Sequence, residues 1–148
     1  MPHFHLSHGA IGPLIDVWIA PSAVRQRALQ LEGKPIPNPV LAKALIDTGA
    51  SHTVVDIGII TQLDLAPTGT MDVITPSTGA TPCQQLTYDL AIFVPLSKPY
   101  SQPWAFPFWV ASAAELQHQG FGVLFGRDLL GRSTFFYDGQ AQLFTLSF

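Results

Sequence analysis

The stretch Leu45–Val55 reads LIDTGASHTVV, and it organises the rest of the chain. An apolar run leads into Asp47, Thr48 and Gly49, and a second run of β-forming residues begins at Thr53. This pattern predicts a strand that ends at a carboxylate and is followed by a turn. The Thr48 hydroxyl can brace the turn, and Gly49 leaves room for a backbone or a ligand to approach closely. The Asp-Thr-Gly tripeptide alone is a weak signal, because it should occur by chance in roughly a few per cent of chains this long.

A second motif, about eighty positions after Asp47, makes the first one informative. Residues Gly122–Leu130 read GVLFGRDLL. The pattern predicts a strand of large apolar residues that ends at Gly126, with a short helix beginning at Arg127 and Asp128.

Length and composition indicate one domain over residues 1–148, with residues 1–12 as a flexible N-terminal tail. Hydrophobic residues make up 47% and charged residues 11%, which fits a β-rich core or a surface buried in an oligomer. No run approaches the roughly 20 apolar residues of a membrane helix, and the N-terminus does not resemble a signal peptide. The net charge of −3 provides no basic face for nucleic acid. We therefore expect a cytoplasmic protein without membrane or nucleic-acid partners.

The expected elements are mostly short strands, separated by prolines and glycines. The predicted strands are 14–20, 40–46, 53–55, 108–110 and 122–125, together with a hairpin over 71–94 whose tip is 76–82 and a second hairpin over 133–148 that turns at Asp138-Gly139. A helix is predicted over 57–65 with Asp56 as its cap, and 22–32 is either a helix or an irregular excursion. Residues 95–107 are expected to be a proline-rich loop containing Tyr100, Trp104 and Phe106, and 111–120 a polar connection.

Two other chemistries are not expected. His3, His5 and His8 suggest a metal site, but no Cys, Asp or Glu completes it, so we expect no metal. Ser51 and His52 are adjacent, but neighbouring side chains on a strand point to opposite faces. We therefore do not expect His52 to act as the base that a catalytic Ser51 would need.

Taken in order, the two motifs resemble those of the aspartic peptidases, most closely the single-domain retropepsins of the retroviral-protease type. The resemblance covers about Leu41 to Leu130 and includes the hairpin between the motifs, which occupies the place of the family's flap. It implies an all-β fold with one or two short helices: a closed β-barrel-like acid-protease fold with one lobe per chain, in which two chains form the active site. Two-lobed pepsin-like enzymes carry two Asp-Thr-Gly-type motifs, whereas this chain has one. The resemblance therefore implies a homodimer that acts on a peptide or protein substrate without a cofactor.

The resemblance also assigns roles to individual residues. The catalytic group would be Asp47, with Thr48 bracing the two active-site loops of the dimer against each other and Gly49 lining the substrate backbone. Substrate contacts would come from Ala50, Ser51 and His52 beside the motif and from Thr78, Gly79 and Ala80 in the flap. Structural support would come from Gly126 beside the catalytic loop, from Arg127, and from Asp128 at the start of the helix.

The chain departs from the retroviral pattern in three places. Retroviral enzymes usually have an acid at the position of Ser51, where it pairs with the arginine of the second motif. Arg127 therefore needs another partner, and Asp56 and Asp128 are the candidates. The flap tip holds one glycine between two prolines, which predicts a flap that is stiffer or that opens by a different hinge. The C-terminal hairpin is longer than the single retroviral strand, so the arrangement of the dimer interface stays open.

The implied mechanism places two Asp47 carboxylates about 3 Å apart, where they share one proton, as is established for this class of enzyme. One carboxylate acts as a base on a bound water and the other donates a proton to the scissile carbonyl. One alternative is a non-catalytic module of the same fold that dimerises and binds extended peptides. Another is a structural role in which the aromatic residues of 95–107 form a contact. The intact motif at Asp47 favours the peptidase, since a binder needs no ionisable pair.

Overall fold

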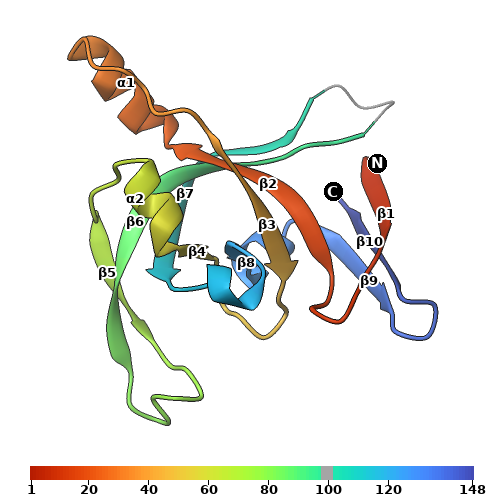
Figure 1. The fold of residues 1–148 in the computed structure, drawn as a ribbon. Coiled ribbons are helices and arrows are strands. Elements are labelled where there is room, and N and C mark those ends of the chain that lie inside the picture. The colour runs from red at the N-terminus through yellow and green to blue at the C-terminus, as the bar shows by residue number, and fades with distance from the viewer. Residues whose placement is uncertain (98–101) are drawn as a thin grey trace.

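The structure is a computed structural model that describes residues 1–97 and 102–148 (Figure 1). In chain order its elements are β1 (His3–Ser7), β2 (Leu14–Pro21), α1 (Ala23–Leu31), β3 (Val40–Ile46), β4 (Val54–Asp56), α2 (Ile57–Gln62), β5 (Gly69–Val73), β6 (Cys83–Val94), β7 (Trp104–Ala114), the 3₁₀ turn η1 (Gln117–Gln119), β8 (Val123–Phe125), α3 (Arg127–Leu130), β9 (Thr134–Asp138) and β10 (Leu143–Ser147). The described part is thus mostly β, as expected, although it has three short α-helices where one or two were predicted.

Six of the strands close into a barrel. Their order is β2-β3-β8-β4-β7-β6, and a pairing of β6 with β2 returns to the start. The β3–β8 and β4–β7 pairs are parallel, and the others are antiparallel. A closed barrel leaves none of its own strands with a free edge. Strand β5 pairs with the first part of β6, from Cys83 to Thr87, whereas β2 pairs with its later part. The β5–β6 hairpin projects from one end of the barrel (Figure 1).

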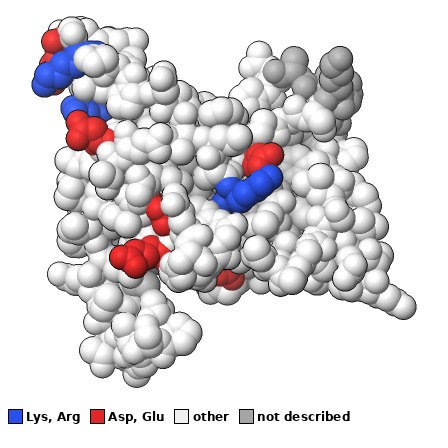
Figure 2. Space-filling model, viewed as in Figure 1, with Lys and Arg blue, Asp and Glu red and all other residues white. Residues whose placement is uncertain are grey.

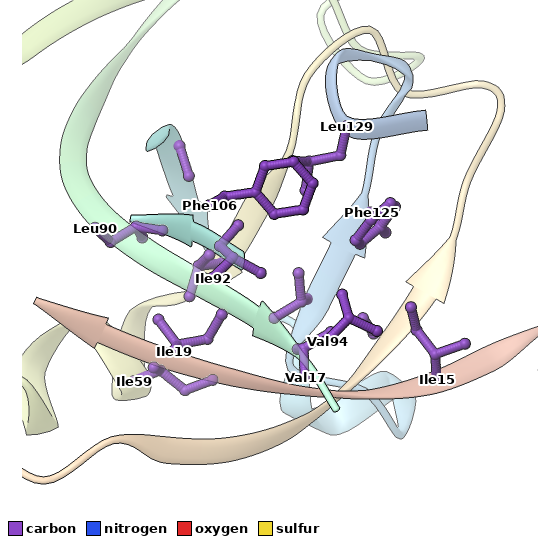
Figure 3. Close-up of a cluster of buried hydrophobic side chains, with 14 of the residues drawn as sticks. Ile15, Val17, Ile19, Ile59, Leu90, Ile92, Val94, Phe106, Phe125 and Leu129 are labelled. Carbon is purple, nitrogen blue, oxygen red and sulfur yellow. The ribbon is translucent and has the colours of Figure 1, made fainter. Parts of the chain in front are cut away.

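The barrel interior is filled by apolar side chains from both strands and helices. Along β2, Ile15, Val17 and Ile19 are buried while Asp16 and Trp18 are exposed, which is the alternation of a strand with one face in the core. Figure 3 shows these side chains meeting those of Leu90, Ile92 and Val94 from β6, Phe106 from β7, Phe125 from β8, Ile59 from α2 and Leu129 from α3. Each large buried side chain stabilises the fold by about 1.5–3 kcal/mol.

Residues 3–7 form a strand, so the flexible tail expected over 1–12 is wrong for these five residues. Strand β1 pairs antiparallel with β10, from His3↔Ser147 to Ser7↔Leu143, and β10 pairs with β9. This three-stranded sheet packs against the barrel through Phe148, whose ring stacks on that of Trp104 at a centroid distance of 4.0 Å. The sequence HFHLS alternates polar and apolar residues, but its partner strand lies at the other end of the chain.

The region after β6 also differs from expectation. Strand β7 begins at Trp104, so the proline-rich loop is shorter than 95–107, and the expected polar connection 111–120 is the end of β7 followed by η1. Pro107 is tolerated because the β6–β7 register shifts between Leu90↔Trp109 and Ile92↔Phe106, which leaves Pro107 in a bulge. Tyr100 lies outside the described residues.

The helices are short, and side chains cap the first turns of α1 and α2. The segment 22–32, left open by the sequence, forms α1, whose Ser22 hydroxyl accepts the N–H of Arg25. Asp56 caps α2 as predicted, accepting the N–H of Gly58 at 2.8 Å. On the face shown in Figure 2, charged side chains gather over α1 and are sparse elsewhere. No helix in the described ranges is both long and apolar enough to cross a membrane.

Candidate active site

Asp47 directly follows β3, in a turn that holds both its backbone and its carboxylate. Its backbone N–H donates to the carbonyl oxygen of Phe125 at 3.1 Å, which fixes the turn to β8. The N–H of Gly49 donates to Asp47 Oδ1 at 2.8 Å. A Cβ at position 49 would lie 3.0 Å from that same oxygen, so a side chain there would crowd the carboxylate. Asp47 is half-buried and Thr48 is exposed, so the acid faces a surface that a second molecule can approach.

The two sequence motifs meet at the end of β8. This strand lies between β3, with Ile46 opposite Phe125, and β4, with Val54 opposite Leu124. The chain from β3 to β4 therefore passes around the end of β8, which brings Gly126 beside the Asp47 loop, as the resemblance implied. At that point Gly126 packs directly against the loop, because a Cβ there would lie 2.5 Å from the carbonyl carbon and oxygen of His52.

Asp128 joins the helix after β8 to the barrel. Its carboxylate accepts the N–H of Thr53 at 2.9 Å, the Thr53 hydroxyl at 2.8 Å, the indole N–H of Trp109 at 3.0 Å and the N–H of Leu129 at 2.9 Å. The predicted role at the start of the helix is thus accompanied by contacts to β4 and β7. Trp109 and Thr53 were not expected at this site, and no local sequence signal pairs them with an acid so far along the chain.

The carboxylate of Asp56, the last residue of β4, also accepts several backbone N–H groups. Its Oδ1 accepts the N–H of Gly58, and its Oδ2 accepts those of Leu116 at 2.8 Å and Gln117 at 3.0 Å. Burial alone would raise the pKa of the Asp56 carboxyl, but these backbone donors outweigh burial and hold that pKa below its ordinary value.

The expected partners of Arg127 are therefore wrong. Asp56 and Asp128 are held by other donors, and the ion pairs of the described residues join Lys34 to Glu32 and Lys43 to Asp16 instead. The Arg127 backbone N–H donates to the carbonyl oxygen of Ala50 at 2.9 Å, while its side chain is exposed.

Ser51 and His52 lie in the turn before β4, so the strand argument that separated their side chains does not apply. Ser51 Oγ lies 3.2 Å from His52 Nδ1, and His52 Nε2 lies 3.1 Å from the hydroxyl of the fully buried Ser112. The imidazole bridges two hydroxyls, and no carboxylate orients it within the described part of the chain. Ser51 and His52 therefore lack the carboxylate that completes the catalytic triad of a serine hydrolase.

The predicted flap residues Thr78, Gly79 and Ala80 lie at the tip of the β5–β6 hairpin. In Figure 1 this tip and the loop after β3 project from the same end of the barrel. The tip is a compact turn: Thr75 N–H donates to the Thr78 hydroxyl oxygen at 2.8 Å, that hydroxyl donates to the Thr75 carbonyl at 3.0 Å, and Gly79 has a φ of +61°. Among the hydrogen bonds of residues 1–97 and 102–148, none joins the tip to the Asp47 loop.

Two surface hollows of the described residues are not lined by Asp47. One of about 480 Å³ is lined by Trp18, Pro39, Phe93, Pro95, Leu96 and Pro103, and one of about 390 Å³ lies between β3, α2 and η1. The described residues contain no group of three His, Cys, Asp or Glu side chains placed to hold a metal ion. A carboxylate such as that of Asp47 can act as a base or, once protonated, as an acid. No protein-family model matches this chain, and no curated protein matches it.

Proposed function

We propose that this protein is a homodimeric aspartic endopeptidase of the retropepsin type, in which two Asp47 carboxylates, one from each chain, activate a water that attacks a peptide bond. The observation that carries the proposal is the Asp47 turn. Its carboxylate accepts the Gly49 N–H and its backbone is fixed to β8 through Phe125, yet the carboxylate makes no ion pair among the described residues. The acids nearest along the two motifs, Asp56 and Asp128, are each held by several donors.

A second chain supplies the second carboxylate that the reaction needs. Hydrolysis of a peptide bond needs a base for the water and an acid for the carbonyl oxygen, and one carboxylate cannot serve as both at the same moment. Two carboxylates at hydrogen-bonding distance share one proton, because like charges that close do not both ionise. The exposed Thr48 beside Asp47 is available to contact its counterpart in the partner.

The reaction then follows in two steps. The ionised Asp47 takes a proton from water while the protonated Asp47 of the other chain donates one to the carbonyl oxygen, giving a tetrahedral intermediate. As the C–N bond breaks, the carboxyl protonated in the first step donates its proton to the departing nitrogen. The other carboxylate takes a proton from a hydroxyl of the intermediate, which becomes the new carboxylic acid, and the pair again shares one proton. The β5–β6 hairpin would cover the substrate and exclude bulk water during this sequence.

The test compares wild type with Asp47→Asn on a mixed peptide library from about pH 4 to 7. We expect cleavage by wild type, inhibition by a statine-type transition-state mimic, and loss of cleavage by at least about a thousandfold in the variant. Asp64→Asn is the matched control, because Asp64 is exposed and adopts a φ of +50°, which asparagine also tolerates. This control should cleave like wild type.

Two results would contradict the proposal. Cleavage that persists in Asp47→Asn assigns the activity to another group. A protein of twice the chain mass that cuts nothing, but binds extended peptides equally well with and without Asp47, is the binding module of the same fold.

A further inference from the structure

We propose that Arg127 is a specificity-determining residue that selects peptides with an acidic side chain close to the cleaved bond. The inference rests on the peptidase function proposed above and adds to it a class of substrate.

Arg127 stands beside the candidate catalytic loop. Its backbone N–H donates to the carbonyl oxygen of Ala50, three residues after Asp47, and the preceding Gly126 packs against the carbonyl of His52. These two contacts place the Arg127 backbone against the loop itself. From this position an exposed arginine side chain can reach a peptide that runs along the loop.

The Arg127 guanidinium has no carboxylate partner in the described residues. Their ion pairs involve Lys34 and Lys43. The undescribed residues 98–101 read KPYS and contain no acid. The contrast with Arg132, five positions on, is informative: its guanidinium lies 5.2 Å from the ring centroid of Trp109 and 5.9 Å from that of Phe106. Arg132 therefore has a packing role, whereas no ion pair or ring contact among residues 1–97 and 102–148 involves the Arg127 side chain.

The surroundings of Arg127 are rich in donors and poor in available acceptors. The Asp128 carboxylate already accepts four hydrogen bonds, and Asp47 Oδ1 accepts the Gly49 N–H. The backbone N–H groups of Ser51 and His52 donate to no acceptor among the described residues. A planar guanidinium binds a carboxylate through two parallel hydrogen bonds, which a neutral amide cannot match. A glutamate or aspartate side chain of the substrate is the acceptor that this edge of the site lacks.

The test uses pairs of peptides that differ only by Glu or Gln at one position near the scissile bond. In wild type we expect one position at which kcat/KM for the Glu peptide exceeds that for the Gln peptide on the order of tenfold. In Arg127→Gln this ratio should fall close to one, and in Arg127→Glu a Lys peptide should be preferred instead. The ratio is taken within each variant, so a general loss of activity cancels. Raising the salt concentration should also shrink the wild-type ratio, since the contact is electrostatic.

The matched control is Arg27→Gln, which removes an exposed arginine of α1 and should keep the wild-type ratio. The inference is overturned if wild type cuts peptides without a Glu preference, if the preference survives in Arg127→Gln, or if Arg27→Gln abolishes it too. It is also overturned if Arg127→Gln converts an active dimer to monomers that cut no peptide, because Arg127 would then pair across the dimer and not with the substrate. Failure of the peptidase function itself looks different: no peptide is cut, and wild type matches Asp47→Asn.

Discussion

At the scale of single residues, the site depends on how closely two backbones approach at Gly126. Its φ of −81° is one that any residue adopts, so the glycine is needed for space and not for its conformational freedom. A Cβ would meet backbone atoms of His52 at 2.5 Å and the nitrogen of Thr53 at 2.9 Å. Backbone cannot rotate away as a side chain can, so the loop that carries Asp47 would have to move.

We therefore expect Gly126→Ala to lower the free energy of unfolding by about 1–3 kcal/mol, measured by urea denaturation. Gly9→Ala is the control, because a Cβ at Gly9 has no atom within 4 Å and its φ lies outside the left-handed region. Equal stability of the two variants would show that the loop and β8 do not pack as closely as described.

The sequence predicted the positions of single residues at the site but not their long-range contacts. Asp47 and Gly126 were both expected at strand ends, and both are there, because each follows an apolar run that signals its own strand. The contacts of Asp128 were not predictable. Its donors Trp109 and Thr53 lie 19 and 75 positions away, so only the folded chain brings them together. The expected pairing of Arg127 with Asp56 or Asp128 was wrong for this reason.

At the scale of elements, Asp56 connects three pieces of the chain. It ends β4, caps α2 and accepts two N–H groups at the entry to η1. Because these donors favour the ionised form, the pKa of the carboxyl lies below its ordinary value of 3.8. A depressed pKa in the folded state contributes stability in full above the ordinary value, and this contribution is lost as the pH falls through the folded pKa.

Asp56→Asn should therefore destabilise the fold by about 1–3 kcal/mol at neutral pH, because an amide NH₂ would face the donors of Leu116 and Gln117. The difference from wild type should shrink as the pH falls below 3.8. Urea denaturation at several pH values measures this, with the exposed Asp72→Asn of β5 as the control. A difference that stays constant down to the lowest pH would show that the Asp56 carboxyl is not held in its ionised form by these donors.

Elements were predicted well where the signal is local. Strand β3, the capped helix α2, and the β5–β6 and β9–β10 hairpins follow from periodicity and turn residues. Strand β1 was missed because its partner is far away, as in the contact between His5 and Thr145, which are 140 positions apart. Strand β7 was shortened because Pro107 looked like a loop residue, and the bulge that accommodates it depends on the pairing with β6.

At the scale of the whole molecule, the chain is one closed barrel with one Asp47 turn and a hairpin projecting from the same end (Figure 1). The second sheet, whose strand order is β1-β10-β9, brings the two ends of the chain together beside the barrel. The resemblance to retropepsins implied that one chain carries only half of an active site. The proposed mechanism requires a dimer of about twice 16.0 kDa, with one active site shared by the two chains.

The most direct measurement of that claim is the peptidase activity of wild-type chains refolded together with Asp47→Asn chains, with the solution mass determined on each sample. If both carboxylates must be present in one site, random pairing at equal amounts should reduce the activity per wild-type chain to about half. Adding Asp64→Asn chains in the same way should cause no loss. If the activity per wild-type chain is unchanged by Asp47→Asn chains, each chain acts alone, and the shared two-carboxylate site is wrong.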